Sequence, residues 1–467
     1  MTTTDVAAAL AQARAQHERY LDGFKTFLRI PSISTDPAYQ AEIERAARWL
    51  VQEMERIGLE HCRIIPTAGH PVVYGDWLHA GADRPTVLIY AHYDVQPVDP
   101  RELWHSDPFE PVEREGKLFA RGAIDDKVGV FVNLKALEAI LSATGRLPVN
   151  VKLLFEGEEE MGSPHMTDFV REQRELLAAD LLLISDGGSE PDQPVIDTAL
   201  RGIVAAEVTV SGPSHDLHSG TYGGIVHNPA HLVGRIIAAL HDANGRVAIP
   251  GFYDDVAPLS AVERELLAAQ EAAMRETLQQ QAGVRAFWGP AEATLLERAT
   301  ALPTCDVNGL YGGYAGPGGK TIIPARAGFK VSMRLVPNQD PQRIAEQFSA
   351  FVRQFATETL DVEVQILALG WWARLLTEGR AVEALKRAYV ATWGKAPALH
   401  REGGSIPVMG AIQRELGLPM TTLGHGIGRN VHAPNEFLYL EYFGRGIATT
   451  IHFLYNLAEL ADGRTVI

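Results

Sequence analysis

Short apolar runs alternate with amphipathic segments along most of the chain. Val87 to Tyr90 are four apolar residues in a row, which is typical of a buried strand, and similar runs occur in 149–155 and 180–185. Residues 41–58 carry apolar side chains at helical spacing and end at a glycine. Helices that alternate with short buried strands predict an α/β fold with a mostly parallel sheet flanked by helices.

The other expected elements follow from the same patterns. Helices are predicted over residues 5–29, 127–142, 228–242, 258–282, 340–355 and 378–393, from about 406, and within 437–461. Strands are predicted over residues 62–65, 71–74, 203–210, 329–335 and 361–367. Residues 303–324 are rich in glycine and are predicted to form a connection, as are the loops 97–117 and 423–436.

The pattern changes after Arg201 and changes back near Gly370. Residues 203–210 alternate between polar and apolar positions, as in an antiparallel strand with one solvated face. A chain of 467 residues is also long enough for two or three domains. We therefore predict a first domain made of residues 1–202 and 369–467, with an α+β domain of residues 203–368 inserted into it.

Composition excludes several kinds of partner. The formal net charge of -16 argues against nucleic acid or an anionic membrane, because both are bound through a cationic surface. The first residues lack the features of a signal peptide, and no apolar stretch is long enough to span a membrane. Cys62 and Cys305 lie far apart and form no CxxC motif. These features together predict a cytoplasmic protein.

Acidic and imidazole side chains follow three consecutive predicted strands. His92 and Asp94 end the first, the segment EGEEE (156–160) follows the second, and Asp186 follows the third. His92 and Asp94 are two positions apart, so an extended chain points both to the same side. The carboxyl ends of parallel strands are also where open α/β sheets bind ligands.

Each of these features has an ordinary explanation when it is taken alone. His92 and Asp94 could form a structural hydrogen bond, and the acidic segment could be a solvated loop. Asp125 and Asp126 stand before a helix predicted from Lys127, where carboxylates serve as caps. Taken together, carboxylates gathered at one sheet edge repel one another and need a cation. Oxygen and nitrogen donors in this number favour two divalent metal ions.

A metal pair of this kind is a hydrolytic device when a spare carboxylate acts as base and other groups stabilise an oxyanion. The acidic segment 156–160 offers the spare carboxylate. The histidine-rich stretches 215–218 and 425–432 offer further ligands or oxyanion donors. Spacing alone does not decide which histidine binds metal.

Six motifs in register resemble those of the co-catalytic zinc metallopeptidases, the family of carnosinase, cytosolic non-specific dipeptidase, carboxypeptidase G and aminoacylase. The motifs are AHYDVQ, ARGAIDDKVG, EGEEEMGS, ISDGG, DLHSGTYGG and NVHAPNE, and they span nearly the whole chain. The stretches KTIIP, RLVPN and REGGSIP are most similar to the dipeptidase branch. The resemblance implies that the first domain is a catalytic di-metal domain and that the inserted α+β domain is a lid and dimerisation domain.

The resemblance also implies a role for each matching residue. The implied metal ligands are His92, Asp125, Glu160, Asp186 and His432. Asp125 would bridge the two ions and be followed by a cis peptide bond, Glu159 would be the general base, and Asp94 would orient His92. The resemblance gives Glu156 and Glu158 no role.

The substrate would be held by residues of the lid and of the last part of the chain. His218 would reach an active site across the dimer and help to hold the oxyanion, and Arg334 would bind the substrate carboxylate. Thr321, Gly404 and Ser405 match positions that contact the substrate in the dipeptidase branch.

The expected function is hydrolysis of dipeptides or short peptides through a metal-bridging water, with Glu159 as the base. Two divalent ions per subunit are expected, with Zn²⁺ as the metal and Mn²⁺ or Co²⁺ as alternatives, in a homodimer joined through the lid. One alternative is an amidohydrolase of the same family that acts on N-acyl or carbamoyl amino acids, since the bond broken is again an amide. The other is a metal-dependent binding protein without turnover, which would have lost the base that this chain retains.

Overall fold

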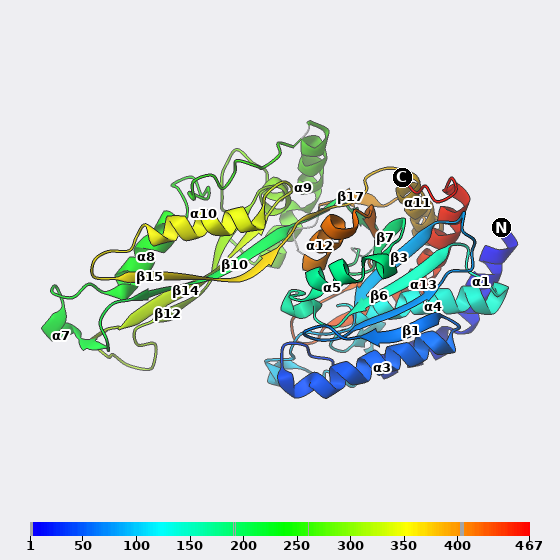
Figure 1. The fold of residues 1–467 in the computed structure, drawn as a ribbon, viewed down its shortest axis with the longest axis horizontal. Helices are drawn as coiled ribbons and strands as arrows, with labels where there is room; N and C mark the ends of the chain where they lie inside the picture. Colours follow the sequence, from blue (N-terminus) through cyan, green and yellow to red (C-terminus); the bar gives the residue numbers. More distant parts are fainter. Residues whose placement is uncertain (1–2, 190, 192, 260, 402–405) are drawn as a thin grey trace. The chain divides into compact units, whose positions relative to one another are not determined.

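The chain forms two compact units in the computed structural model, which describes residues 3–467 except 190, 192, 260 and 402–405 (Figure 1). The first unit comprises Met1–Thr198, Arg374–His400 and Ala411–Ile467, and the second comprises Ala199–Ala373 and Arg401–Gly410. The second unit begins and ends near the limits predicted for the inserted domain. Arg401–Gly410 lies outside those limits and groups with the second unit.

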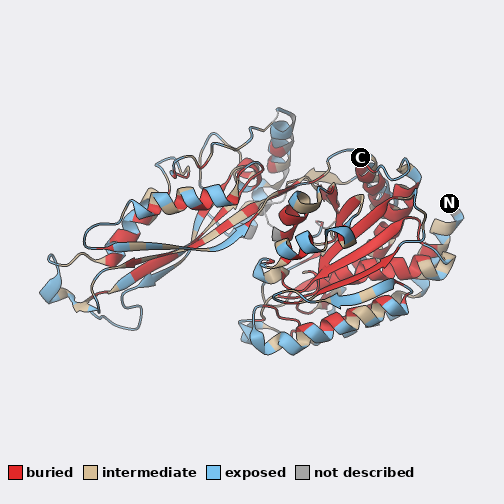
Figure 2. Ribbon diagram, in the orientation of Figure 1, coloured by how far each residue is buried: buried red, intermediate tan, exposed pale blue. Residues whose placement is uncertain are grey.

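A mixed six-stranded sheet is the centre of the first unit. Its strand order is β1 (Glu60–Ile65), β2 (Val72–Trp77), β6 (Asn150–Glu156), β3 (Thr86–His92), β7 (Leu181–Ile184) and β18 (Met420–Thr422). The four strands from β6 to β18 are parallel, whereas β1 and β2 are antiparallel to their neighbours. The residues of β2, β3, β6 and β7 are buried, as Figure 2 shows by colour. Burial on both faces explains their nearly continuous apolar sequences and confirms the predicted α/β class with a mostly parallel sheet.

Helices cover this sheet and share its core. They are α1 (Thr3–Ala15), α2 (His17–Leu28), α3 (Gln40–Arg56), α4 (Lys127–Thr144), α5 (Met166–Glu172), α6 (Arg174–Leu177), α11 (Arg380–Trp393) and α13 (Leu440–Leu460), while α12 (Pro407–Leu416) has residues in both units. The prediction of one helix over 5–29 was wrong, because Gln16 leaves the helical conformation and separates α1 from α2. Neither glycine nor proline marks this break, so the sequence around Gln16 carries no signal that would end a helix.

Several short elements were not identified from sequence. A second sheet of the first unit joins β19 (Gly428–Arg429), β20 (Phe437–Tyr439), β5 (Lys117–Phe119) and β4 (Val112–Arg114). Strand β20 begins the segment predicted to be the closing helix, and the helix itself begins at Leu440. The other short strands are β8 (Val195–Asp197), β9 (Ala199–Leu200), β16 (Ala373–Arg374) and β17 (Ala398–His400). The short helical turns are the 3-10 turns η1 (Pro37–Tyr39), η2 (Arg101–Leu103) and η3 (Glu159–Met161) and the π-helical turn η4 (Glu297–Ala301).

The second unit is an antiparallel sheet with helices. The sheet order is β12 (Thr304–Gly312), β14 (Arg326–Leu335), β10 (Gly202–Ser211) and β15 (Asp361–Gly370). The helices are α7 (Ser219–Tyr222), α8 (Pro229–Ala239), α9 (Ala261–Ala282) and α10 (Pro341–Arg353), and a small pair joins β11 (Leu217–His218) to β13 (Ile322–Ile323). Burial alternates along β10 as predicted. The prediction of a connection over 303–324 was wrong for β12, a largely exposed edge strand whose glycines hide its pattern.

No helix in the described ranges is long and apolar enough to cross a membrane.

A buried cluster of charges fixes three helices of the first unit to one another. Glu138 of α4 is 4 % exposed and forms ion pairs with Arg19 of α2, Arg56 of α3 and Lys135 of α4. Burial alone would raise the pKa of the Glu138 carboxyl, but its hydrogen bonds with these cations lower that pKa to about 2. The carboxylate therefore stabilises the fold at neutral pH, and this stabilisation is lost as the pH falls below 4 toward 2.

We expect Glu138→Gln to lower the free energy of unfolding by about 1–3 kcal/mol, because it removes the buried anion that the buried Lys135 ammonium shares with the half-exposed guanidinium groups of Arg19 and Arg56. Urea denaturation at pH 7 measures the change. Glu44→Gln is the control, since Glu44 pairs with Arg48 on the exposed face of α3 and its loss should change stability little. Equal effects of the two substitutions would contradict the assignment.

Candidate metal site

The carboxyl ends of β3, β6 and β7 lie at the same edge of the six-stranded sheet. Tyr90 pairs with Ile184 at the end of β7, and His92 pairs with Glu156 at the end of β6. The segments that follow these strands therefore start side by side. This register is the reason that residues distant in sequence meet at one place, as the sequence pattern predicts.

Two groups of potential metal ligands meet at this edge. One consists of His92, Asp125 and Asp186, and the other of Asp125, Glu160 and His432; within each group the ligand atoms lie within 4.8 Å of one another. Asp125 belongs to both groups through different oxygens. Its Oδ1 is 3.1 Å from His92 Nε2, and its Oδ2 is 2.9 Å from His432 Nε2. Its peptide bond to Asp126 is cis, as the resemblance implies.

The electrostatics of the cluster favour a cation. Burial and neighbouring carboxylates raise the pKa of Asp186 to about 7 and also raise the pKa of Glu160. Hydrogen bonds with Asp125 and Glu160 raise the pKa of His432 to about 10. The Oε1 atom of Glu160 is buried, and no residue in the described part of the chain bonds to it. Imidazole nitrogens, carboxylate oxygens and a buried free acceptor fit two divalent metal ions.

Asp94 lies next to His92 on the side away from Asp125. It contacts both ligand groups, whereas the resemblance gives it only the role of orienting His92. It is fully buried, and its Oδ1 is 3.3 Å from His92 Nδ1, the ring nitrogen that faces away from Asp125. Its carboxylate also accepts the backbone N–H groups of Glu159 at 3.2 Å and Glu160 at 3.0 Å. Asp94 therefore orients one ligand of the first group and holds the turn η3 that supplies Glu160 to the second.

Glu159 stands beside both groups but belongs to neither. Burial raises the pKa of its carboxyl well above the ordinary value, and the charges of Asp186 and Glu160 act in the same direction. Among the residues that the structure describes, none forms a hydrogen bond or ion pair with this carboxylate. Glu159 therefore has the properties expected of the spare carboxylate that hydrolysis by a metal pair requires.

Three further side chains lie beside the candidate ligands, and none of them was assigned its observed contacts from sequence. Gln96 donates a hydrogen bond of 2.7 Å to Glu160 Oε2. Asp126 was considered as a helix cap, but its side chain makes no capping bond and accepts the backbone N–H of His92 at 3.2 Å. Glu158 is buried and accepts the backbone N–H groups of His70 and His165. Of these three side chains, only Gln96 has a signal in the sequence. It follows Asp94 by two positions on an extended segment, which points both side chains to the same side.

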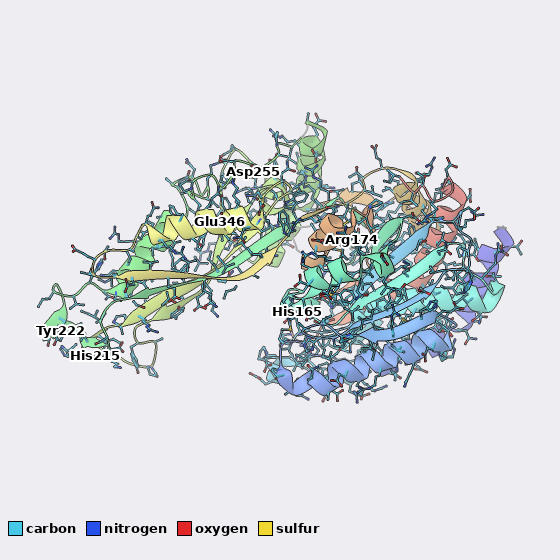
Figure 3. The ribbon with its side chains drawn as sticks, in the orientation of Figure 1. His165, Arg174, His215, Tyr222, Asp255 and Glu346 are labelled. Atoms are coloured by element: carbon cyan, nitrogen blue, oxygen red, sulfur yellow. The ribbon has the colours of Figure 1, made fainter. Side chains whose placement is uncertain are left out.

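His218 and Thr321, which were predicted to contact substrate, lie close together in the second unit. His218 pairs with Ile322 between β11 and β13, and the carbonyl of Thr321 accepts the backbone N–H of Ser219 at 3.0 Å. His218 Nδ1 accepts the Gly220 N–H at 3.1 Å, so the neutral ring carries its proton on Nε2, which is a donor. His215, which precedes His218, and Tyr222, the last residue of α7, are labelled in Figure 3.

Arg334 lies far from His218 within the same unit. It pairs with Ile203 at one end of β10, whereas His218 follows the other end, where Ser211 pairs with Arg326. Eight residues of strand separate the two ends, which is about 26 Å at the usual rise. One copy of the second unit therefore does not bring these two predicted substrate contacts together. Gly404 and Ser405 lie outside the described residues.

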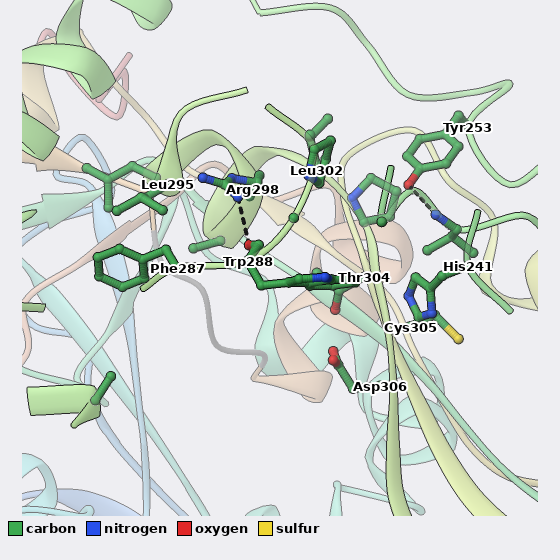
Figure 4. Close-up of a pocket in the computed structure, with 18 of the residues that line it drawn as sticks. His241, Tyr253, Phe287, Trp288, Leu295, Arg298, Leu302, Thr304, Cys305 and Asp306 are labelled. Atoms are coloured by element: carbon green, nitrogen blue, oxygen red, sulfur yellow. Dashed lines mark hydrogen bonds between the residues drawn. The ribbon is translucent and has the colours of Figure 1, made fainter. Parts of the chain in front are cut away.

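The second unit also contains an apolar cavity of about 410 Å³. His241, Trp288, Leu295 and Cys305 are among the side chains that line it, and the Trp288 carbonyl accepts a hydrogen bond from Arg298 (Figure 4). Among its described lining residues, none is a predicted site residue. The cavity is therefore separate from the chemistry that the sequence predicts.

Comparison with known proteins gives consistent matches over nearly the full length. Residues 88–456 match the description "Peptidase family M20/M25/M40". The Cys-Gly metallodipeptidase dug1 of Schizosaccharomyces pombe is 32% identical over 457 residues, which cover 92% of this chain and 94% of that protein.

Two solved structures have the same fold. An M20 family metallo-carboxypeptidase from Sulfolobus solfataricus has a TM-score of 0.87 and 33% identity, and the match covers 94% of this chain and 99% of that one. Human carnosine dipeptidase 1 has a TM-score of 0.84 and 26% identity, with 97% and 99% covered.

Proposed function

The chain belongs to peptidase family M20/M25/M40, and we propose that it is a di-metal metallopeptidase that hydrolyses dipeptides or short peptides. The observation that carries this proposal is the pair of ligand groups joined through Asp125, with Glu159 beside them as a carboxylate to which no described residue bonds. The substrates named for the Schizosaccharomyces pombe and human relatives support the dipeptidase assignment.

The proposed ligands of the first ion are His92, Asp125 and Asp186, and those of the second are Asp125, Glu160 and His432. Two divalent ions held there would polarise the scissile carbonyl and lower the pKa of a bound water. We propose Zn²⁺, with Mn²⁺ or Co²⁺ as alternatives.

Proton transfer is the task of Glu159 in this mechanism. Its carboxylate takes a proton from the attacking water and later delivers that proton to the leaving amine. Burial raises the pKa of this carboxyl, which makes the carboxylate a stronger base than that of an ordinary glutamate. Asp94 acts through others, since it orients His92 and fixes the backbone of the turn that carries the base.

We propose that the second unit is a lid and dimerisation domain. Its His218 offers an Nε2–H donor for the oxyanion of the partner subunit's active site, which is consistent with its distance from Arg334 in one subunit. Arg334 would bind the substrate carboxylate, and Thr321, Gly404 and Ser405 would contact the substrate. We also propose a cytoplasmic location, which the free thiols of Cys62 and Cys305 support.

Two other activities deserve direct comparison. The Sulfolobus solfataricus structure, which is 33% identical, is described as a metallo-carboxypeptidase, and such an enzyme releases the last residue of longer peptides. An amidohydrolase that acts on N-acyl or carbamoyl amino acids would use the same metal site, because the bond is again an amide. These activities differ in what they require at the amino end of the substrate.

The test is a substrate panel after metal removal and reconstitution. The chelated protein should be inactive, and Zn²⁺ or Mn²⁺ should restore cleavage of dipeptides with a free amino group. N-acyl amino acids and longer peptides with the same C-terminal residue form the comparison arms. Cleavage of acyl amino acids without any dipeptide would contradict the dipeptidase assignment, and full activity without metal would contradict the mechanism.

A further inference from the structure

A buried carboxylate at the start of β20 organises the segment that ends in Asp125. Glu436 is fully buried. Its Oε2 accepts hydrogen bonds from Arg121 Nη1 at 2.6 Å and the Gly122 N–H at 3.1 Å. Its Oε1 accepts the N–H of Ile124 at 2.9 Å and that of Asp125 at 3.4 Å. The Glu436 carboxylate thus accepts four hydrogen bonds from the five consecutive residues 121–125.

Arg121 is fixed on its other side as well. It is 1 % exposed, its Nη2 donates to the Pro97 carbonyl at 2.8 Å, and its guanidinium lies 5.5 Å from the centre of the Trp104 ring. The backbone carbonyl of Glu436 also accepts the N–H of Ala120 at 3.2 Å. Because buried N–H groups need acceptors, the carboxylate of Glu436 is the partner that lets this irregular segment be buried.

The hydrogen bonds of Glu436 matter for metal binding because they reach the backbone of Asp125. Asp125 offers Oδ1 to the ligand group of His92 and Oδ2 to the ligand group of His432. A displacement of the Asp125 backbone therefore changes both groups at once. Glu436 also follows His432 by four residues, so it ties the segment of one ligand to the segment of the ligand that both ions share.

We propose that Glu436 is the positioning residue of Asp125 and that it sets the affinity of both metal sites together. This inference rests on the proposed di-metal function. It distinguishes Glu436 from Gln96, whose hydrogen bond reaches only Glu160 and hence only the second ligand group. It also distinguishes Glu436 from Glu138, which is also buried but pairs with cations of the helices α2, α3 and α4 and with no candidate ligand.

Glu436→Gln is the first test, because the amide keeps the size of the side chain but turns an NH₂ group toward two of the four donors. Metal-stripped protein is titrated with Zn²⁺ in competition with a chromophoric chelator. We expect both dissociation constants to rise by about 10- to 100-fold, the usual effect of losing a group that orders a metal ligand. At saturating Zn²⁺ the value of kcat should return toward that of the native protein.

Two control variants make the result specific. Gln96→Ala should weaken one of the two sites, and Glu138→Gln should weaken neither although it lowers stability. If Glu436→Gln does not fold, Glu436→Asp takes its place, because it keeps the charge but reaches fewer donors.

The inference is overturned if either Glu436 variant keeps native affinity at one or both sites, or if Glu138→Gln weakens zinc binding equally. Failure of the proposed function has another signature: the native protein itself would bind no zinc.

Discussion

Glu159→Gln is expected to lower kcat for dipeptide hydrolysis by about 10²- to 10⁴-fold, the usual contribution of a general acid–base group. The amide can neither take the proton of the attacking water nor return it to the leaving amine. Zinc binding should persist with both ions, because Glu159 belongs to neither ligand group. The two measurements are kcat under saturating substrate and the zinc content after dialysis.

Glu156→Gln is the matched control for this experiment. Glu156 lies in the same acidic segment, is fully buried and accepts a hydrogen bond from Tyr90 Oη at 2.7 Å. Burial raises its pKa to about 8, so at pH 7 the carboxyl is mostly protonated and glutamine resembles it closely. We expect kcat to change far less. Unchanged turnover in Glu159→Gln would exclude it as the base, and loss of zinc would make it a ligand.

The position of the site could be predicted from sequence because it depends on strand ends. His92, the segment after Glu156 and Asp186 follow strands whose apolar runs are unmistakable, and parallel pairing brings such ends together. Which oxygen of Asp125 faces which histidine could not be predicted, because it depends on a backbone fixed by Glu436 from the far end of the chain. Long-range hydrogen bonds of this kind leave no periodic signal.

The fold could be predicted where burial imposes a regular pattern of apolar residues on the sequence. The central strands and the helix α4 are buried on nearly all sides, and their apolar sequences mark them. The strands β12 and β20 were missed for the opposite reason, since β12 is an exposed edge and β20 is only three residues long. The conformation of both strands is decided by pairing with a neighbouring strand, and not by the pattern of their side chains.

A mixture of two inactive variants should recover activity if His218 acts across a dimer. We expect His218→Ala alone to lose about 10²- to 10³-fold in kcat, as for the loss of one oxyanion donor. When His218→Ala and Glu159→Gln chains are co-expressed, a mixed dimer has one site that combines native Glu159 with native His218. Random assembly gives mixed dimers in half of the cases, so the recovered activity should be about a quarter of that of the native protein.

The geometry of the second unit is the reason to expect this recovery. His218 and Arg334 are both expected to contact one dipeptide, yet Arg334 pairs with Ile203 at one end of β10, whereas His218 follows the other end of that strand. Two subunits can bring His218 and Arg334 to the same active site, which a single subunit does not. His215→Ala is the control, since His215 lies in the same exposed loop and bonds to its neighbour Ser214 at 3.0 Å. Purified heterodimers with no more activity than the sum of the two variants would show that His218 does not serve the partner subunit.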